Sequence, residues 1–77
     1  MSVHGVSEIF GRVLELPAVD AETDFFSSGG DSLLATRVLS AIARRYGVEL
    51  SYDDFLLAPT PATLAKTIAS ATNGTGR

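Results

Sequence analysis

The 77-residue sequence contains no cysteine and a single histidine. Without cysteine the chain forms neither disulfides nor thiolate metal sites, which suits a reducing compartment, and we expect it to act in the cytoplasm. Six Lys/Arg residues against nine Asp/Glu give a net charge of −3, and no basic run is long enough to follow a nucleic-acid backbone. No apolar run approaches the ~20 residues that cross a bilayer, so we expect neither a nucleic-acid nor a membrane partner.

Hydrophobic residues make up 45% of the chain and charged residues 19%, a balance that predicts a folded protein rather than a disordered one. A chain this short supports one domain with one small core and leaves little room for a deep enclosed active site. We therefore expect residues 1–77 to form a single domain, ordered over about residues 5–71, with 72–77 as a flexible tail.

The spacing of apolar residues predicts four helices and no strand. The expected helices cover residues 6–16, stopped by Pro17; 31 or 32 to 46, closed by Gly47; 51 or 53 to 57, stopped by Pro59; and 61 to about 71. The sequence thus predicts an all-α fold, a small four-helix bundle with three main helices, a short third helix and a long loop between helices one and two.

The long loop, residues 17–30, needs anchors on the core, and Val19, Phe25 and Phe26 are the apolar residues that can supply them. In the last helix we expect Leu64 and Ile68 to point inward. Projection of the second helix places one apolar stripe toward the core, made of Leu34, Ala35, Val38, Leu39, Ile42 and Tyr46. The opposite face of that helix carries Leu33, Arg37, Ser40 and Arg44.

The stretch GGDSLL, residues 29–34, allows three interpretations. It can be an ordinary bend followed by a helix cap. It can hold a catalytic serine, but the only histidine, His4, lies near the terminus, and no second glycine completes a nucleophile elbow. We therefore predict no catalytic residue and no metal site. In the third interpretation Ser32 is itself a substrate, exposed where free N–H groups and the helix dipole favour a phosphate, with Gly29 and Gly30 letting another enzyme approach.

A wider pattern resembles a known family. The run D-x-F-F-x-x-G-G-D-S-L-L-A-T-R, then R-R-Y-G-V-E-L and D-F-L-L-A-P-T, is similar to the peptidyl carrier (thiolation) domains of nonribosomal peptide synthetases. The likeness spans roughly residues 6–70. It implies that a phosphopantetheinyl transferase, using coenzyme A and magnesium, attaches 4′-phosphopantetheine to Ser32, beside Gly30, Asp31 and Leu33. It also implies a monomeric, non-catalytic carrier loaded by an adenylation domain and served by condensation or tailoring enzymes.

Three positions depart from the usual pattern of that family. Ser28 replaces a leucine before the glycines, Asp31 replaces a commoner histidine, and Leu57 stands where a polar residue is frequent. An acyl carrier of a polyketide or fatty-acid pathway and an unmodified helical interaction module are the rival interpretations. Carriers of the fatty-acid kind resemble one another in an acidic second helix, whereas here the second helix after Asp31 has arginines and no acid.

These arginines suggest how partners recognise the domain. We expect Leu33, Arg37 and Arg44 to form a mixed apolar and basic docking strip, although the arginines could simply be solvated. Leu57 either gives the short third helix extra apolar surface, as a further docking residue, or turns into the core.

Overall fold

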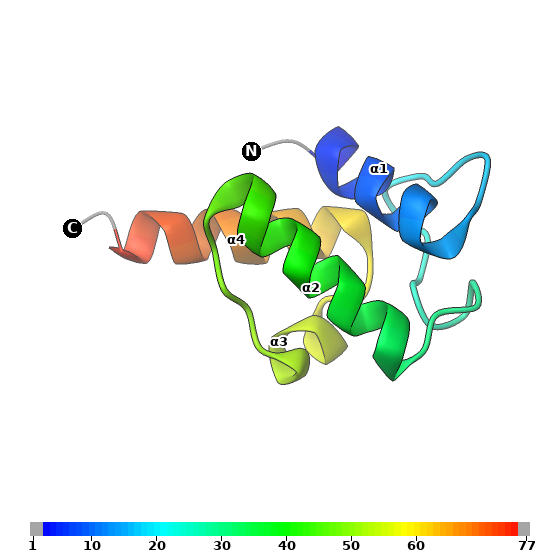
Figure 1. The fold of residues 1–77 in the computed structure, drawn as a ribbon. Helices are drawn as coiled ribbons and strands as arrows, with labels where there is room; N and C mark the ends of the chain where they lie inside the picture. The colour runs from blue at the N-terminus through cyan, green and yellow to red at the C-terminus, as the bar shows by residue number, and fades with distance from the viewer. Residues whose placement is uncertain (1–2, 76–77) are drawn as a thin grey trace.

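The computed structural model describes residues 3–75, with side chains described up to residue 71. Four helices make up the fold: α1 (Val3–Leu14), α2 (Ser32–Tyr46), α3 (Tyr52–Leu57) and α4 (Pro61–Thr75). Helix α1 packs against α2 and α4, and α3 packs against α2. Figure 1 shows α2 crossing in front of α4, with α3 below it and the long loop returning from α1 to the start of α2. The predicted all-α bundle is confirmed.

Three fully buried aromatic rings meet at the centre of the core. Phe10 of α1, Phe25 of the long loop and Phe55 of α3 contact one another edge to face, with ring centroids 4.9 to 6.0 Å apart. Such pairs contribute about 0.5–1.5 kcal/mol each beyond the area they bury. Leu64 and Ile68 bring α4 to this core, as predicted. Of the stripe predicted on α2, Ala35, Val38 and Ile42 are buried and Leu34, Leu39 and Tyr46 are partly buried against the core.

The long loop is fixed to the rest of the bundle by backbone hydrogen bonds as well as by side chains. The Phe25 N–H donates to the Pro59 carbonyl at 2.8 Å, and the Ala62 N–H donates to the Ala21 carbonyl at 3.1 Å. Val19 and Phe26 pack against the core, so all three predicted anchors are confirmed. The anchored loop therefore holds the start of α2 in a defined position.

Helix α1 starts three residues earlier and ends two residues earlier than the periodicity predicted. Its end is a Schellman motif, in which Glu15 takes a left-handed conformation (φ 57°) and the Leu16 N–H donates to the Gly11 carbonyl at 3.0 Å. Pro17 follows this motif and does not itself stop the helix. The prediction failed because a non-glycine residue supplies the left-handed turn.

The other helix ends follow from their caps. Asp31 and Gly47 bound α2 as predicted, and Ser51, not Asp53, caps α3 through a reciprocal capping box with Asp54. Helix α4 runs on to Thr75, four residues past the predicted end, because Asn and Gly disfavour a helix by only ~1 kcal/mol or less and no proline intervenes. Of the predicted tail, residues 76–77 lie outside the described residues.

Candidate functional site

Ser32 is the first residue of α2, and its position is set by the residue before it. Asp31 has extended backbone angles (φ −142°, ψ −174°), and its carboxylate accepts the Leu34 N–H at 2.9 Å. The Asp31 carbonyl also accepts the Ala35 N–H at 2.8 Å, which closes the first turn. Aspartate at this position satisfies one of the unpaired donors of the helix start. The serine side chain is consequently held at the tip of α2 and exposed to solvent.

The Ser32 hydroxyl has one side-chain partner in the described part of the chain. Its Oγ lies 3.2 Å from the hydroxyl oxygen of Tyr52, the first residue of α3, and both side chains are exposed. The backbone N–H groups of Ser32 and Leu33 donate to no acceptor within residues 3–71. Such free donors at the positive end of a helix favour an anion. A phosphate ester on Ser32 Oγ fits here, although the nearby Asp31 carboxylate opposes its charge.

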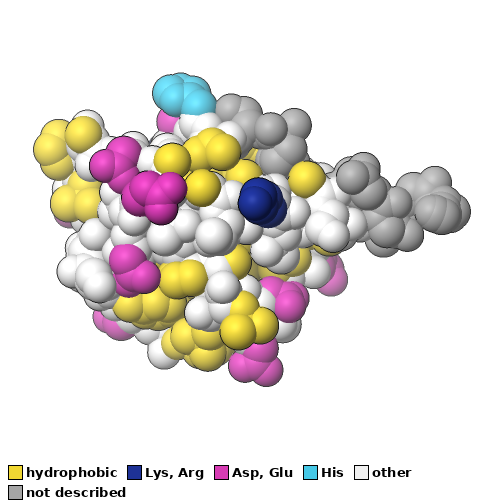
Figure 2. Space-filling model, turned by 180° about the vertical axis from the view of Figure 1, so that it is seen from behind, with side chains coloured by type: hydrophobic (Ala, Val, Ile, Leu, Met, Phe, Trp, Pro, Cys, Tyr) yellow, Lys and Arg dark blue, Asp and Glu magenta, His cyan; other side chains and the backbone are white. Residues whose placement is uncertain are grey.

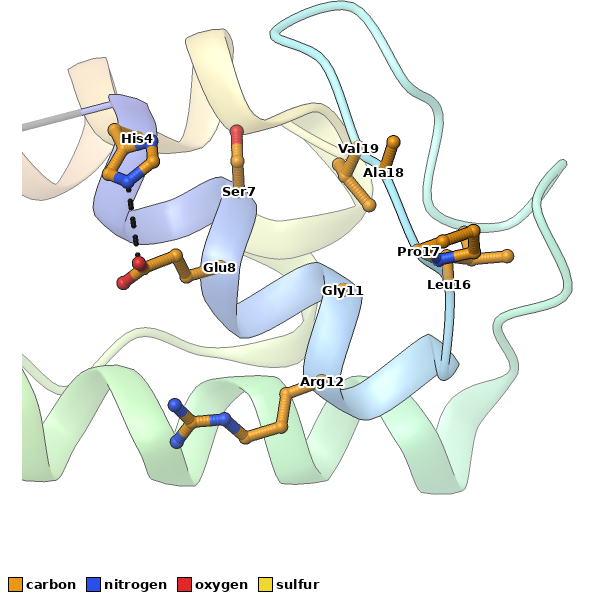
Figure 3. A pocket seen from close by; sticks show the side chains of 9 residues that line it. All are labelled: His4, Ser7, Glu8, Gly11, Arg12, Leu16, Pro17, Ala18 and Val19. Carbon is orange, nitrogen blue, oxygen red and sulfur yellow. Dashed lines mark ion pairs between the residues drawn. The ribbon is translucent and has the colours of Figure 1, made fainter.

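The one histidine of the sequence, His4, does not lie beside this serine. His4 forms an ion pair with Glu8 on α1, with Nε2 and Oε2 3.3 Å apart, as Figure 3 shows. Within the described side chains, no group of three His, Asp or Glu residues could hold a metal ion. None of the helices formed by residues 3–75 has the length and apolar character needed to cross a membrane. The geometry offers a displayed hydroxyl without the partners of a catalytic triad.

The two glycines before Asp31 have reasons inside the fold. Gly29 takes a φ of +108°, which side chains rarely tolerate. The Gly30 N–H donates to the Phe25 carbonyl at 3.0 Å. A Cβ on Gly30 would lie 2.7 Å from that carbonyl oxygen and closer still to two carbons of the Phe25 ring. The pair is therefore needed to turn the chain and to seat Phe25, a constraint that the sequence did not reveal.

Three of the four predicted docking residues come together in the structure. Leu33 (66% exposed), Arg37 and Arg44 line a groove of about 340 Å³ between α1 and α2, to which α1 contributes Ile9, Arg12 and Val13. We call this the arginine groove. The part played by α1 was missed because it depends on how two helices cross.

Leu57 does not line the arginine groove; it is 86% exposed on α3, so it lies on the surface and not in the core. Tyr52 and Leu56 are also exposed on this short helix. Figure 2 shows hydrophobic side chains gathered along the lower edge of the molecule, the side on which α3 lies. The helix that contacts Ser32 through Tyr52 therefore also exposes apolar side chains to solvent. The Tyr52 contact spans 20 residues of sequence and had no local signal.

Known proteins share both the sequence pattern and the fold. The family model described as phosphopantetheine attachment site matches residues 4–68. Pyochelin synthetase PchE of Pseudomonas aeruginosa (strain UCBPP-PA14) is 46% identical over 67 residues, which are 87% of this chain and 5% of that protein. The chain thus spans only a small part of this relative.

Two solved structures are similar along most of the chain. One is of the phosphopantetheine transferase Sfp in complex with coenzyme A and a peptidyl carrier protein; the match has a TM-score of 0.86 at 31% identity and covers 91% of each chain. The other, of McyG A-PCP complexed with phenylalanyl-adenylate, has a TM-score of 0.81 at 30% identity over 86% of this chain and 10% of that one.

Proposed function

The chain belongs to the phosphopantetheine attachment site family, as a peptidyl carrier domain of the nonribosomal peptide synthetase kind, and we propose that Ser32 is its attachment residue. One observation carries this proposal: the Ser32 hydroxyl is displayed at the start of α2, next to two N–H groups that no acceptor within residues 3–71 uses. Residues 1–77 would then act as one carrier domain. The domain is not an enzyme, and its cofactor is 4′-phosphopantetheine, donated by coenzyme A.

Attachment needs little from the carrier beyond a reachable hydroxyl. Ser32 Oγ would form an ester bond to the phosphorus of the pantetheine phosphate while the pyrophosphate bond of coenzyme A breaks. Adenosine 3′,5′-bisphosphate would leave, and the serine proton would pass to a base on the transferase. When attached, the cofactor supplies a thiol that holds an acyl group as a thioester. Because the cofactor brings this sulfur, the absence of cysteine from the chain is no obstacle.

The neighbours of Ser32 have separate roles in this proposal. Asp31 caps α2 and so orients the serine, while Gly30 lets the loop close tightly over Phe25. The Leu33 N–H and the Ser32 N–H, which have no acceptor within residues 3–71, would be available to stabilise the charge of a phosphate on Ser32. The Leu33 side chain points outward and meets the enzymes that come to this site.

The carried group would be an aminoacyl, aryl or peptidyl unit. The partners we propose are a phosphopantetheinyl transferase, an adenylation domain, and condensation or tailoring enzymes, in line with the solved complex of a peptidyl carrier protein with Sfp. A tether gives each partner the bound group at an effective concentration of order mM. We further propose that the domain works as a monomer in the cytoplasm, where coenzyme A is available.

The test of attachment is intact mass after incubation with coenzyme A, magnesium and a promiscuous transferase. The wild-type protein should gain the mass of one phosphopantetheine, and Ser32→Ala should gain none while its helical circular dichroism is unchanged. Ser40→Ala, which removes another exposed α2 hydroxyl, is the matched control and should gain mass like the wild type. If the mass of the folded wild-type protein does not change, Ser32 is not an attachment residue, and GGDSLL only bends the chain and caps α2.

Docking is tested separately from attachment. We propose that Leu33, Arg37, Arg44 and Leu57 contact the adenylation or condensation partner, since all four are exposed. Leu33→Ala, Leu57→Ala and Arg37→Glu should each raise the KM for loading by the adenylation domain and leave thermal stability unchanged. Lys66→Glu, on α4, serves as the control for a change of surface charge. Identical loading kinetics for all variants would eliminate Leu33, Arg37 and Leu57 as contacts.

A further inference from the structure

The positive charges of this acidic protein are concentrated between α1 and α2. Arg12 lies on α1, and Arg37, Arg44 and Arg45 lie on α2, which has no acidic residue of its own. Six of the nine acidic residues lie in the long loop, at the cap of α2 and on α3: Asp20, Glu22, Asp24, Asp31, Asp53 and Asp54. Figure 2, which views the molecule from the side opposite Figure 1, shows acidic side chains in several places and very little blue.

Most of these arginines form no ion pair with the side chains that the structure describes. Arg45 pairs with Glu8, Nη1 to Oε1, at 3.4 Å. Within residues 3–71, no carboxylate forms an ion pair with Arg12, Arg37 or Arg44, and all three side chains are exposed. Like charges gathered around one hollow raise the local positive potential and attract an anionic partner. We therefore expect these three arginines to attract carboxylates of a partner molecule.

The arginine groove combines these charges with an apolar floor. Ile9 is buried, Val13 and Ala41 are half-buried, and Leu33 is exposed at the end next to Ser32. A hollow of about 230 Å³ continues the groove toward Arg45. In Figure 3 the Arg12 side chain extends from α1 along α2, and its guanidinium group lies below the His4–Glu8 pair. Solvated arginines on a flat surface would not enclose apolar side chains in this way.

We propose that the arginine groove binds an acidic amphipathic helix of a partner protein. This deepens the proposed function, because it gives the chemistry of a segment on the enzymes that the carrier serves. Arg37 and Arg44 are two helical turns apart, about 10.5 Å, so they match carboxylates seven residues apart on a parallel or antiparallel helix. Its apolar side chains would rest on Ile9, Val13 and Leu33, in the helix-in-groove mode. A neutral ligand, such as the pantetheine chain, would leave the guanidinium groups unpaired.

A designed peptide of about 15 residues, near the shortest length at which an isolated helix is stable, tests this pairing. It carries leucines at i, i+3, i+4 and i+7 with glutamates on both flanks, and its control has glutamine at every glutamate position. The protein is the Ser32→Ala variant, labelled with ¹⁵N, so that binding does not depend on attachment. Titration should shift amide signals of α1 and α2, and the Kd should rise with salt concentration.

Substitutions then test whether the three arginines cause the binding. Replacing Arg12, Arg37 and Arg44 together by glutamine should weaken binding of the acidic peptide by about threefold to a hundredfold, since exposed charge pairs each contribute a factor of roughly 1.4 to 5. Lys66→Gln, an exposed cation on α4, should leave the Kd unchanged. The glutamine peptide should bind the parent protein as weakly as the acidic peptide binds the triple variant.

Three results would overturn the proposal: no binding of the acidic peptide, equal affinity for the glutamine peptide, or amide shifts confined to α3. Each leaves the attachment of phosphopantetheine untouched, because that is read from mass alone. Conversely, a failure of Ser32 to gain mass would leave the peptide titration unaffected.

Discussion

Replacing Gly30 by alanine tests how the core presents Ser32, the proposed attachment residue. The added Cβ would lie 2.7 Å from the Phe25 carbonyl oxygen, a backbone atom that cannot give way cheaply, and closer still to the Phe25 ring. Phe25 is fully buried between Phe10 and Phe55, so it has no free space into which to move. Overpacking of this kind costs about 1–3 kcal/mol, and displacing a core Phe about 3–5. We expect a loss of about 2–4 kcal/mol from a total stability of roughly 4–12.

Gly29→Ala is the matched control, because nothing lies within 4 Å of its added Cβ and only its φ of +108° is unfavourable. It should lose only about 1–2 kcal/mol. Urea unfolding followed by circular dichroism measures the free energy of unfolding of both variants. In thermal unfolding, the melting temperature of Gly30→Ala should fall by about 10–25 °C. If Gly30→Ala is as stable as the wild type, or less affected than Gly29→Ala, Phe25 does not require glycine at this position and the reasoning is refuted.

Three further substitutions examine the surroundings of Ser32. Asp31→Ala should lower stability by ~1 kcal/mol because the Leu34 N–H loses its acceptor, while Asp31→Asn, a cap of similar quality, should lower it by a few tenths at most; equal urea midpoints for the two would contradict the capping role. Ser51→Ala should destabilise by about 1 kcal/mol by removing the capping box of α3, and an unchanged midpoint would count against that box. Tyr52→Phe should change stability by less than ~1 kcal/mol, because its hydrogen bond to Ser32 is exposed, yet it should shift the Ser32 Cβ signal in NMR spectra; a shift as large in Tyr46→Phe would argue against the contact.

The sequence alone predicted those elements that local chemistry marks. Helix α2 was placed correctly at both ends because Asp31 and Gly47 are cap residues of familiar types. The exposed face of α2 followed from its periodicity, and Leu33, Arg37 and Arg44 lie on the surface as expected. In these cases the residues within one helical turn determine where the helix begins or ends and which of its side chains are exposed.

What escaped prediction depends on contacts between distant segments. The end of α1 is set by Glu15 in a conformation that glycine usually supplies, so no local signal announced it. The need for glycine at position 30 arises from where Phe25 packs, and the Tyr52 contact with Ser32 arises from how α3 meets α2. Arg12 joined the site only because α1 and α2 cross. Such constraints become visible when the tertiary structure is known.

The proposed function requires that the folded bundle presents one hydroxyl, that of Ser32 at the tip of α2, for covalent modification. Trypsin cleavage after Arg12 and Arg37 yields a fragment that holds Ser27, Ser28 and Ser32 together. After incubation with the transferase and coenzyme A, fragmentation mass spectrometry of this peptide identifies the modified side chain. Our account predicts the whole added mass on Ser32; a modification on Ser27 or Ser28 would contradict it.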